Sequence, residues 1–269
     1  MTRTTDGIPD SYRMVHLAET DSTNAEAMRR ALAGEAGPLW VRADQQTAGR
    51  GRSGRSWVSL AGNLHASLVI STNCPVAQVG QLSLVAGVAA FDAINAAGRL
   101  NSNETLRLKW PNDILVGTAK AGGILIESSV CRAGAGMTAV VGVGLNLEVP
   151  PEGLGAAATN LAAHGLSLSP GEALCFLAQA MDAWLKTWND GQGFALVREA
   201  WLARTGAPGE RLTVYAGDVR VEGRFKGLDE DGALVIAENG GGERRVTFGD
   251  VRLASEPDEA HTQERDERA

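Results

Sequence analysis

Residues 46–57, QTAGRGRSGRSW, combine glycine and arginine in a way that suits anion binding. Gly49, Gly51 and Gly54 spell G-x-G-x-x-G, and Arg50, Arg52 and Arg55 stand between and after them. Glycines leave the backbone free to approach a ligand, and guanidinium groups pair with phosphate or carboxylate in a planar fork. Three like charges on such a loop also disfavour order until an anion binds. The stretch therefore predicts a mobile loop that holds an anionic ligand.

Two well-known phosphate-binding loops do not explain this stretch. A Rossmann turn requires a helix directly after the glycines and an acidic residue about 20 positions further on. Here the following SWVSLAGNLHASL is β-type, and no Asp or Glu occurs between Asp44 and Asp92. The P-loop pattern G-x-x-x-x-G-K-[ST] is absent from the sequence. This stretch alone therefore leaves three interpretations open: a solvated basic loop, a nucleic-acid-binding patch and a binding site for another polyanion.

A second group of candidate residues surrounds a proline in LKWPNDILV, residues 108–116. Lys109, Asn112 and Asp113 lie where Pro111 must interrupt a β-type run. Polar side chains at such a break are favoured places for binding and catalysis, although an ordinary turn explains them equally well.

Two further stretches offer polar groups at the ends of predicted elements. Lys120 stands three residues before Gly123 and a buried apolar run, where it could approach an anion or simply occupy a turn. Ser22, Thr23 and Asn24 stand at a predicted helix start, which could bind polar groups or simply cap the helix.

The elements that must position these residues follow from hydrophobic periodicity and turn signals. Strands are predicted at 12–18, 38–44, 63–71, 106–110, 113–117, 122–130 and 137–149, and helices at 23–34, 78–98, 170–191 and 193–204. Thr23 is the predicted N-cap of the first helix, with Glu26 completing a capping box. Trp184, Trp188 and Trp201 have the spacing of packing residues. After residues 205–210, short strands separated by Gly-rich turns predict a small antiparallel barrel.

Composition limits the class of protein. The 269 residues are 44% hydrophobic with a net charge of −7, which argues against general attraction to nucleic acid. The sequence lacks an 18-residue apolar run and a signal peptide, so we expect a cytoplasmic protein without a membrane span. Cys74, Cys131 and Cys175 are expected to be buried free thiols, and no structural metal is expected. Residues 255–269 hold six acidic residues and two arginines and are predicted to be disordered.

The motifs occur in an order that resembles the biotin–protein ligases. The resemblance covers residues 12–254 and rests on DSTN, GRGRSGRSW, GNL, KWPNDI, KAGGIL, GVGLN and the pattern GxxxGLDExGAL. It implies an α/β (α+β) fold: a mixed-sheet catalytic domain of the biotin/lipoate ligase type at 1–206, a small SH3-like β-barrel at 207–254, and the charged tail at 255–269. It also resembles the ligase-only form, because the match begins near Tyr12 and eleven residues are too few for the DNA-binding domain of many relatives.

The resemblance implies roles for individual residues. The implied biotin-binding residues are Ser22, Thr23, Asn24, Gln46, Arg50, Gly51, Arg52, Lys120, Gly123 and Leu125. The implied ATP- or adenylate-binding residues are Gly49, Arg50, Arg52, Arg55, Trp57, Lys109, Asn112 and Asn146. Lys120, Arg52 and Asp113 are the implied catalytic residues, with Asp113 either a general base or an orienting group. Two positions depart from the family pattern: Leu60 stands where a proline is usual, and His65 where an aromatic residue is common.

The chemistry implied by the resemblance has two steps. Biotin and ATP, with Mg²⁺ on the phosphates, give biotinyl-5'-AMP, and the biotinyl group then passes to a lysine of a biotin carboxyl carrier domain. The expected partners are these substrates and the carrier, with neither DNA nor membrane, and the expected oligomeric state is a monomer or homodimer. Lipoate–protein ligation is the rival activity, and nucleic-acid binding through the arginine loop is the rival of another class.

Overall fold

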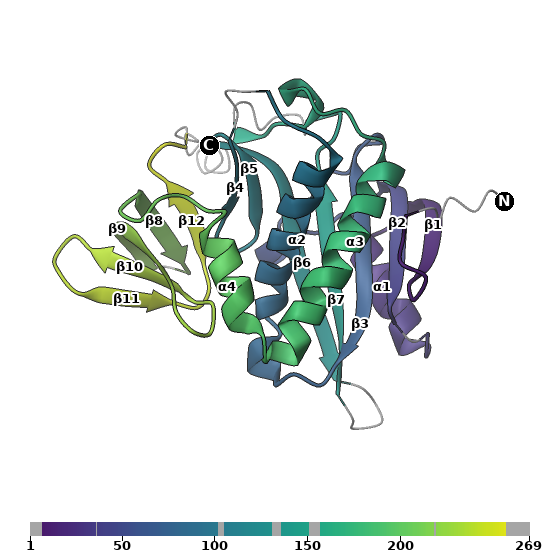
Figure 1. Cartoon of the computed structure of the whole chain (residues 1–269), viewed down its shortest axis with the longest axis horizontal. Helices are drawn as coiled ribbons and strands as arrows, with labels where there is room; N and C mark the ends of the chain where they lie inside the picture. Colours follow the sequence, from purple (N-terminus) through teal and green to yellow (C-terminus); the bar gives the residue numbers. More distant parts are fainter. Residues whose placement is uncertain are drawn as a thin grey trace, which may run out of the picture.

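A mixed seven-stranded sheet forms the larger part of the chain, and a five-stranded sheet lies beside it (Figure 1). The computed structural model describes residues 7–35, 37–101, 105–130, 136–150, 157–217 and 219–256. The strands of the large sheet are β1 (Arg13–Thr20), β2 (Leu39–Gln46), β3 (Leu64–Thr72), β4 (Leu106–Lys109), β5 (Asp113–Val116), β6 (Ala119–Val130) and β7 (Met137–Leu145). Each of them overlaps a strand predicted from the sequence, and the predicted fold class is confirmed.

The order of strands in the large sheet is β1-β2-β3-β7-β6-β5-β4. β1 and β2 run parallel, and the other neighbouring pairs are antiparallel. β7 ends four residues earlier than predicted, because the next backbone N–H groups donate to the side chain of Asn63 and not to a neighbouring strand. The Asn63 Oδ1 accepts hydrogen bonds from the backbone N–H groups of Leu147, Glu148 and Val149 at 2.9, 3.2 and 3.2 Å.

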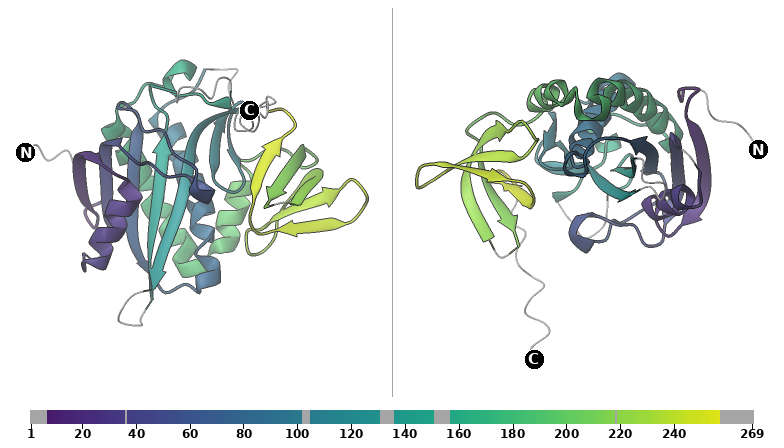
Figure 2. Two further views of the ribbon diagram at one scale, coloured as in Figure 1. Left: turned by 180° about the vertical axis from the view of Figure 1, so that it is seen from behind. Right: turned by 90° about the horizontal axis from the view of Figure 1, so that it is seen from below.

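The two faces of the large sheet are covered differently. On one face, Trp40, Leu68 and Val141 belong to the main core with residues of α2 (Gln81–Ala97), α3 (Pro170–Trp188) and α4 (Phe194–Leu202). The opposite face carries α1 (Thr23–Leu32), where Ala27 packs with a separate apolar cluster on β2, β3 and β7. The view from below in Figure 2 shows these helices on the two sides of the sheet. Of the described α-helices, α1 alone therefore packs on this face.

The start of α1 differs from its prediction by one residue. Ser22, not Thr23, is the N-cap, and its hydroxyl accepts from the backbone N–H of Ala25 at 3.5 Å. Thr23 is the first helical residue and turns its hydroxyl to the Gln46 Oε1 at 3.0 Å. Glu26 pairs with arginines of the same helix instead of completing a capping box. Gly34 follows the helix with a φ of +95°, as the predicted stop requires.

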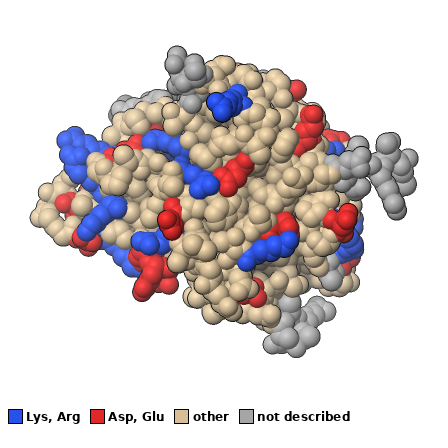
Figure 3. Space-filling model, viewed as in Figure 1, with Lys and Arg blue, Asp and Glu red and all other residues tan. Residues whose placement is uncertain are grey.

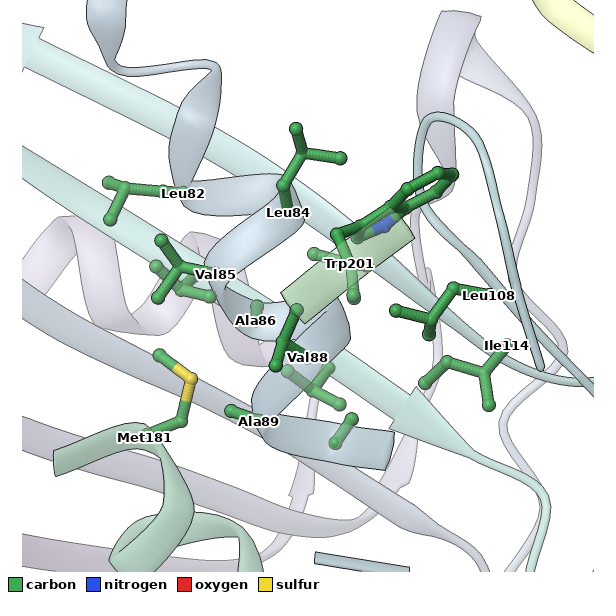
Figure 4. Close-up of a cluster of buried hydrophobic side chains, with 14 of the residues drawn as sticks. Leu82, Leu84, Val85, Ala86, Val88, Ala89, Leu108, Ile114, Met181 and Trp201 are labelled. Carbon is green, nitrogen blue, oxygen red and sulfur yellow. The ribbon is translucent and has the colours of Figure 1, made fainter. Parts of the chain in front are cut away.

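The helix α2 is more apolar than the sequence analysis allowed for. Together with the preceding turn it spans Val76–Ala97, and this segment is long and apolar enough to cross a membrane by length and composition. Two thirds of its most apolar window, 67%, is buried inside the protein. Its composition is therefore explained by its place in the main core (Figure 4), where Leu108 and Trp201 both pack close to Gly87.

The predicted packing tryptophans lie as expected. Trp188 and Trp201 are 2% exposed, and Trp184 packs against the same core. Cys74 is a buried free thiol as predicted, whereas Cys175 is only half-buried and forms no disulfide within the described part of the chain. Cys131 lies outside the described residues.

The five-stranded sheet contains β8 (Arg211–Ala216), β9 (Val219–Leu228), β10 (Leu234–Glu238), β11 (Glu243–Val246) and β12 (Asp250–Leu253). Its order is β11-β10-β9-β8-β12, with antiparallel pairs throughout. Polar contacts join it to the larger sheet: the Trp110 indole N–H donates to the Gly232 carbonyl at 3.1 Å, and Arg107 pairs with Glu210 at 3.0 Å. The boundary between residues 206 and 207 stays a prediction.

Candidate active site

The sheet face that carries α1 also carries most of the predicted site residues. Directly paired residues of antiparallel strands project on the same face. Two adjacent rows of paired residues cross β6, β7 and β3: Gly123, Gly144 and His65, and, two positions along, Leu125, Gly142 and Ser67. Half of these positions are glycine, so other parts of the chain can approach the sheet closely. We call this surface the glycine-rich face.

Trp57 occupies the space above the first row. A Cβ atom at Gly144 would lie 2.7 Å from its ring, and one at Gly123 would lie 3.1 Å from it. The Trp57 ring nitrogen is buried, with no hydrogen-bond partner among the described residues. The Lys120 ammonium group lies 5.6 Å from the ring centroid, within the range of a cation–π contact. The KAGGIL and GVGLN motifs thus provide the glycines on which the tryptophan of the arginine loop rests.

Asp113 lies between two lysines. Its Oδ1 is 2.5 Å from the Lys120 Nζ, and its Oδ2 is 3.2 Å from the Lys109 Nζ. Lys109 ends β4 and Asp113 begins β5, so the proline turn of KWPND brings them opposite each other. Burial alone would raise the pKa of Asp113, but Lys120 and Lys109 outweigh it and hold this pKa below its ordinary value. Asp113 is therefore an ionised acceptor of two ammonium groups.

The arginines of the loop each have a partner far away in the sequence. Arg52 donates to the Gly249 carbonyl at 3.2 Å, and Arg55 pairs with Asp250 at 2.7 Å. Arg50 pairs with Glu127 at 2.9 Å. The sequence analysis did not anticipate these acidic partners: Glu127 faces Arg50, and Asp250 faces Arg55 and also lies 3.6 Å from Arg52. Whether the loop is mobile without ligand stays a prediction.

Arg52 is the most enclosed of these arginines. Its side chain is 22% exposed, and it also donates to the Asn112 Oδ1 at 3.2 Å. Burial lowers the pKa of Arg52, while the nearby Asp250 and Asp113 oppose this effect. Arg52 therefore joins the arginine loop, the KWPND turn and the five-stranded sheet at one point.

The residues around the start of α1 form a polar cluster over the second row of the glycine-rich face. The Gln46 Oε1 accepts from the backbone N–H of Thr23 at 2.7 Å. The Asn24 Oδ1 accepts from the Ser67 hydroxyl at 2.6 Å, and the Asn24 amide donates to the Glu127 carboxylate at 2.8 Å. A Cβ atom at Gly142 would lie 2.2 Å from this Asn24 oxygen, so Asn24 requires glycine there. Because Glu127 also binds Arg50, it connects this cluster to the arginine loop.

Two of the predicted ATP-binding residues use their amides inside the protein. The Asn112 amide donates to the Ile124 carbonyl at 2.8 Å and fixes the KWPND turn on β6. Asn146 is 2% exposed, and its amide donates to the Thr159 carbonyl at 2.9 Å. Both contacts explain these asparagines structurally, so their contact with adenylate stays a prediction.

The two departures from the family pattern contact each other. His65 is 2% exposed, and its Nε2 lies 3.2 Å from the Leu60 carbonyl oxygen. Burial lowers the pKa of His65, and the Leu60 carbonyl only partly opposes this. The neutral ring then donates from Nε2 to Leu60. Its Nδ1 is buried, with no partner in the part of the chain that the structure describes.

Sequence analysis missed the acidic partners of the arginines. Glu127 directly follows the apolar run at residues 122–126 of β6, which was a usable signal for a charge close to the core. Asp250 and Gly249 carried no such signal, since they stand at the start of a short strand of a separate sheet. Ser67 was also missed because it reads as one more residue of a β-type run.

The fold is that of a ligase of the biotin/lipoate type. A sequence model of the biotin/lipoate A/B protein ligase family matches residues 18–146, and one of the biotin protein ligase C-terminal domain matches residues 209–253. The chain belongs to the biotin protein ligases.

Individual relatives agree with this membership. The biotin–[acetyl-CoA-carboxylase] ligase of Paracoccus denitrificans is 41% identical over 227 residues, covering 82% of this chain and 92% of the relative. The enzyme of the same name from Mycobacterium tuberculosis is 33% identical, covering 87% of this chain and 86% of the relative. A structure of the Aquifex aeolicus biotin protein ligase in complex with biotin and ATP superposes with a TM-score of 0.73 at 25% identity, covering 90% of this chain and 99% of that one.

Proposed function

We propose that this protein activates biotin with ATP to form biotinyl-5'-AMP and pyrophosphate, and then transfers the biotinyl group to a lysine of a biotin carboxyl carrier domain. The observation that carries the proposal is the arrangement of Lys120, Trp57 and Gly123. The Lys120 ammonium group lies over the Trp57 ring, which in turn rests on Gly123 and Gly144. That pattern suits an apolar ring system with a carboxylate at the end of its chain.

In the first step, the biotin carboxylate must approach the α-phosphorus of ATP, although both groups are negatively charged. Lys120 is 35% exposed and is the cation of the Asp113 cluster that a substrate reaches. We assign it to the biotin carboxylate and then to the acyl phosphate, where a fixed cation stabilises the developing charge. We assign Arg50, Arg52 and Arg55 of the arginine loop to the phosphates as hydrogen-bond donors.

The polar cluster at the start of α1 is assigned to the ureido end of biotin. Ser22, Thr23 and Asn24 present buried hydroxyl and amide groups near the second row of the glycine-rich face, and Gln46 adds a half-buried amide. A ureido ring has two N–H donors and one carbonyl acceptor, and these residue types can meet both kinds of group. The Leu125 side chain would provide apolar contact beside them.

In the second step, Asp113 is better suited to orienting groups than to removing a proton. A general base works best with a pKa near the operating pH, and two lysines hold the pKa of Asp113 below its ordinary value. We therefore assign Asp113 to holding Lys120 and Lys109 in place. The incoming lysine amine would lose its proton to another acceptor.

The remaining parts of the proposal concern partners. ATP enters as its magnesium complex, so the metal is part of the substrate. The described residues contain no group of three or more His, Cys, Asp or Glu side chains that could hold a metal ion. The names of the relatives support the carrier domain of acetyl-CoA carboxylase as acceptor. A cytoplasmic location, a monomeric or homodimeric state and the lack of a DNA partner belong to the same proposal.

The surface gives the nucleic-acid alternative little support. On the face shown in Figure 3, the described basic side chains are interspersed with acidic ones, and many of both lie over the five-stranded sheet.

The experiment that tests the proposal is pyrophosphate exchange with MgATP and either biotin or lipoate. We expect exchange with biotin followed by labelling of one carrier lysine. Exchange with lipoate alone would contradict the proposal. Salt-dependent nucleic-acid binding without exchange would favour a nucleic-acid-binding protein.

A further inference from the structure

Four charged residues of alternating sign form a chain that ends in the site. The Glu256 Oε1 lies 2.6 Å from the Lys109 Nζ, which lies 3.2 Å from the Asp113 Oδ2. The Asp113 Oδ1 in turn lies 2.5 Å from the Lys120 Nζ, above the Trp57 ring. Three of these charged side chains are no more than 15% exposed, and Lys120 is 35% exposed. The enclosed end of this chain is formed by a residue that follows the five-stranded sheet.

Glu256 is held in place by its own backbone. It lies three residues after the end of β12, and its N–H donates to the Leu253 carbonyl at 3.0 Å. One of its carboxylate oxygens accepts from the Leu253 N–H at 3.3 Å while the other binds Lys109. The sequence placed this residue in a disordered tail; residues 257–269 lie outside the described residues, but Glu256 has a defined position.

We propose that Glu256 is a positioning residue for the ligase reaction, acting on Lys120 through Lys109 and Asp113. The inference rests on the proposed function of the site. The Lys109 ammonium group is nearer to Glu256 than to Asp113, so the two carboxylates share its charge. The Asp113 carboxylate is therefore left to make its short contact with Lys120. Without Glu256, Lys109 would have only Asp113 as a described ion-pair partner and would draw that carboxylate away from Lys120.

The charges favour this direction of effect. Burial would lower the pKa of Lys109, but Asp113 and Glu256 outweigh it and raise this pKa above its ordinary value. When Glu256 is neutralised, Asp113 is the carboxylate that remains beside Lys109, and the ammonium group turns to it. A displacement of about 1 Å in a positioned group can cost up to about 10²-fold in rate, so a partial displacement of Lys120 predicts a loss on the order of tenfold.

The test combines kinetics with a measurement on the ligand-free protein. Glu256→Gln keeps the size of the side chain and removes its charge. We expect it to lower the kcat of biotin-dependent pyrophosphate exchange on the order of tenfold. Glu256→Asp keeps the charge and should retain most of the activity. Glu222→Gln is the matched control, because Glu222 is an exposed carboxylate of the same sheet that pairs with Arg220.

The chain has four lysines, so protein labelled with ¹⁵N at lysine alone gives a simple Nζ spectrum. In Glu256→Gln, the resonances of both Lys109 and Lys120 should move, while Lys186 and Lys226, which pair with Asp182 and Glu243, should stay. An unchanged Lys120 resonance, kcat within twofold of the wild type, or equal losses in the Gln and Asp variants would each overturn the inference. Wild-type protein without biotin-dependent exchange would instead refute the proposed function, while the spectrum would still report on the network.

Discussion

The carbonyl oxygen of Trp57 lies directly against Gly49, and a Cβ atom on that glycine would stand only 2.4 Å from it. The two residues are also joined by a hydrogen bond of 2.9 Å from the Trp57 N–H to the Gly49 carbonyl. The arginine loop is therefore closed by backbone packing at its base. Neither Gly49 nor Gly51 has a positive φ; within the loop, Ser53 and Gly54 do, at 55° and 75°. The close approach of the Trp57 carbonyl, and not a positive φ, therefore explains the glycine at position 49.

Gly49→Ala should therefore destabilise the loop, and Gly51→Ala should not. A Cβ at Gly51 would meet the Arg55 carbonyl at 3.4 Å, which is ordinary contact, and its φ of −105° suits alanine. Overpacking at Gly49 is expected to cost about 1–3 kcal/mol. Urea unfolding of both variants measures this difference. Equal free energies of unfolding for the two variants would show that the base of the loop accommodates a Cβ at Gly49 without loss of stability.

Lys120→Met should lower the rate of adenylate formation far more than it lowers stability. Removing a donor aimed at a developing anion costs about 10²–10³ in kcat. Asp113 keeps Lys109 as a partner, so we expect only about 1–2 kcal/mol of lost stability, below the cost of a fully unpaired buried charge. Pyrophosphate exchange and denaturant unfolding measure the two effects. A variant that keeps a third of the wild-type kcat would mean that Lys120 is only a turn residue.

Arg52→Gly should let biotinyl-AMP form but escape. The Arg52 side chain holds the loop on the Gly249 carbonyl and on Asn112, so its removal loosens the cover of the site. Released adenylate would then label lysines of unrelated proteins, which mass spectrometry detects.

Arg55→Gly is the control for this release. Arg55 is 59% exposed and contributes a surface ion pair with Asp250, so its loss should release much less adenylate. Equal labelling of bystander proteins by both variants, or none by Arg52→Gly, would argue against a specific anchoring role for Arg52.

His65→Phe should remove a part of the pH dependence of folding. Burial lowers the pKa of His65 in the folded protein, so below about pH 6.5 the unfolded chain binds a proton that the folded one does not. Wild-type stability therefore falls as the pH drops below that value, with a slope of up to about 1.4 kcal/mol per pH unit from this residue. Unfolding free energies at pH 7.5 and 5.5 should differ less in the variant. An unaltered pH dependence would mean that His65 titrates normally.

Local signals in the sequence predicted the strands, the helices and the candidate residues of the site. Alternating and apolar runs marked each strand of the large sheet. The arginine–glycine loop indicated anion binding and the KWPND turn indicated binding or catalysis, both without any tertiary information. These features depend on neighbours within a few residues. The exact end residues of helices and strands were predicted less accurately, as the one-residue error at the Ser22 cap shows. Adjacent polar residues can each satisfy the same backbone groups at such an end.

Only the tertiary structure decided which charges meet. Glu127, Asp250 and Glu256 neutralise Arg50, Arg55 and Lys109. Each acidic residue lies far along the chain from its partner, on an element whose register and orientation no local pattern fixes. The same holds for Gly49, whose constraint comes from the Trp57 carbonyl packed against it and not from its own φ. Ion pairs and close approaches of this kind depend on how the two sheets and the loop are placed in space, since electrostatic and packing energies fall off within a few ångströms.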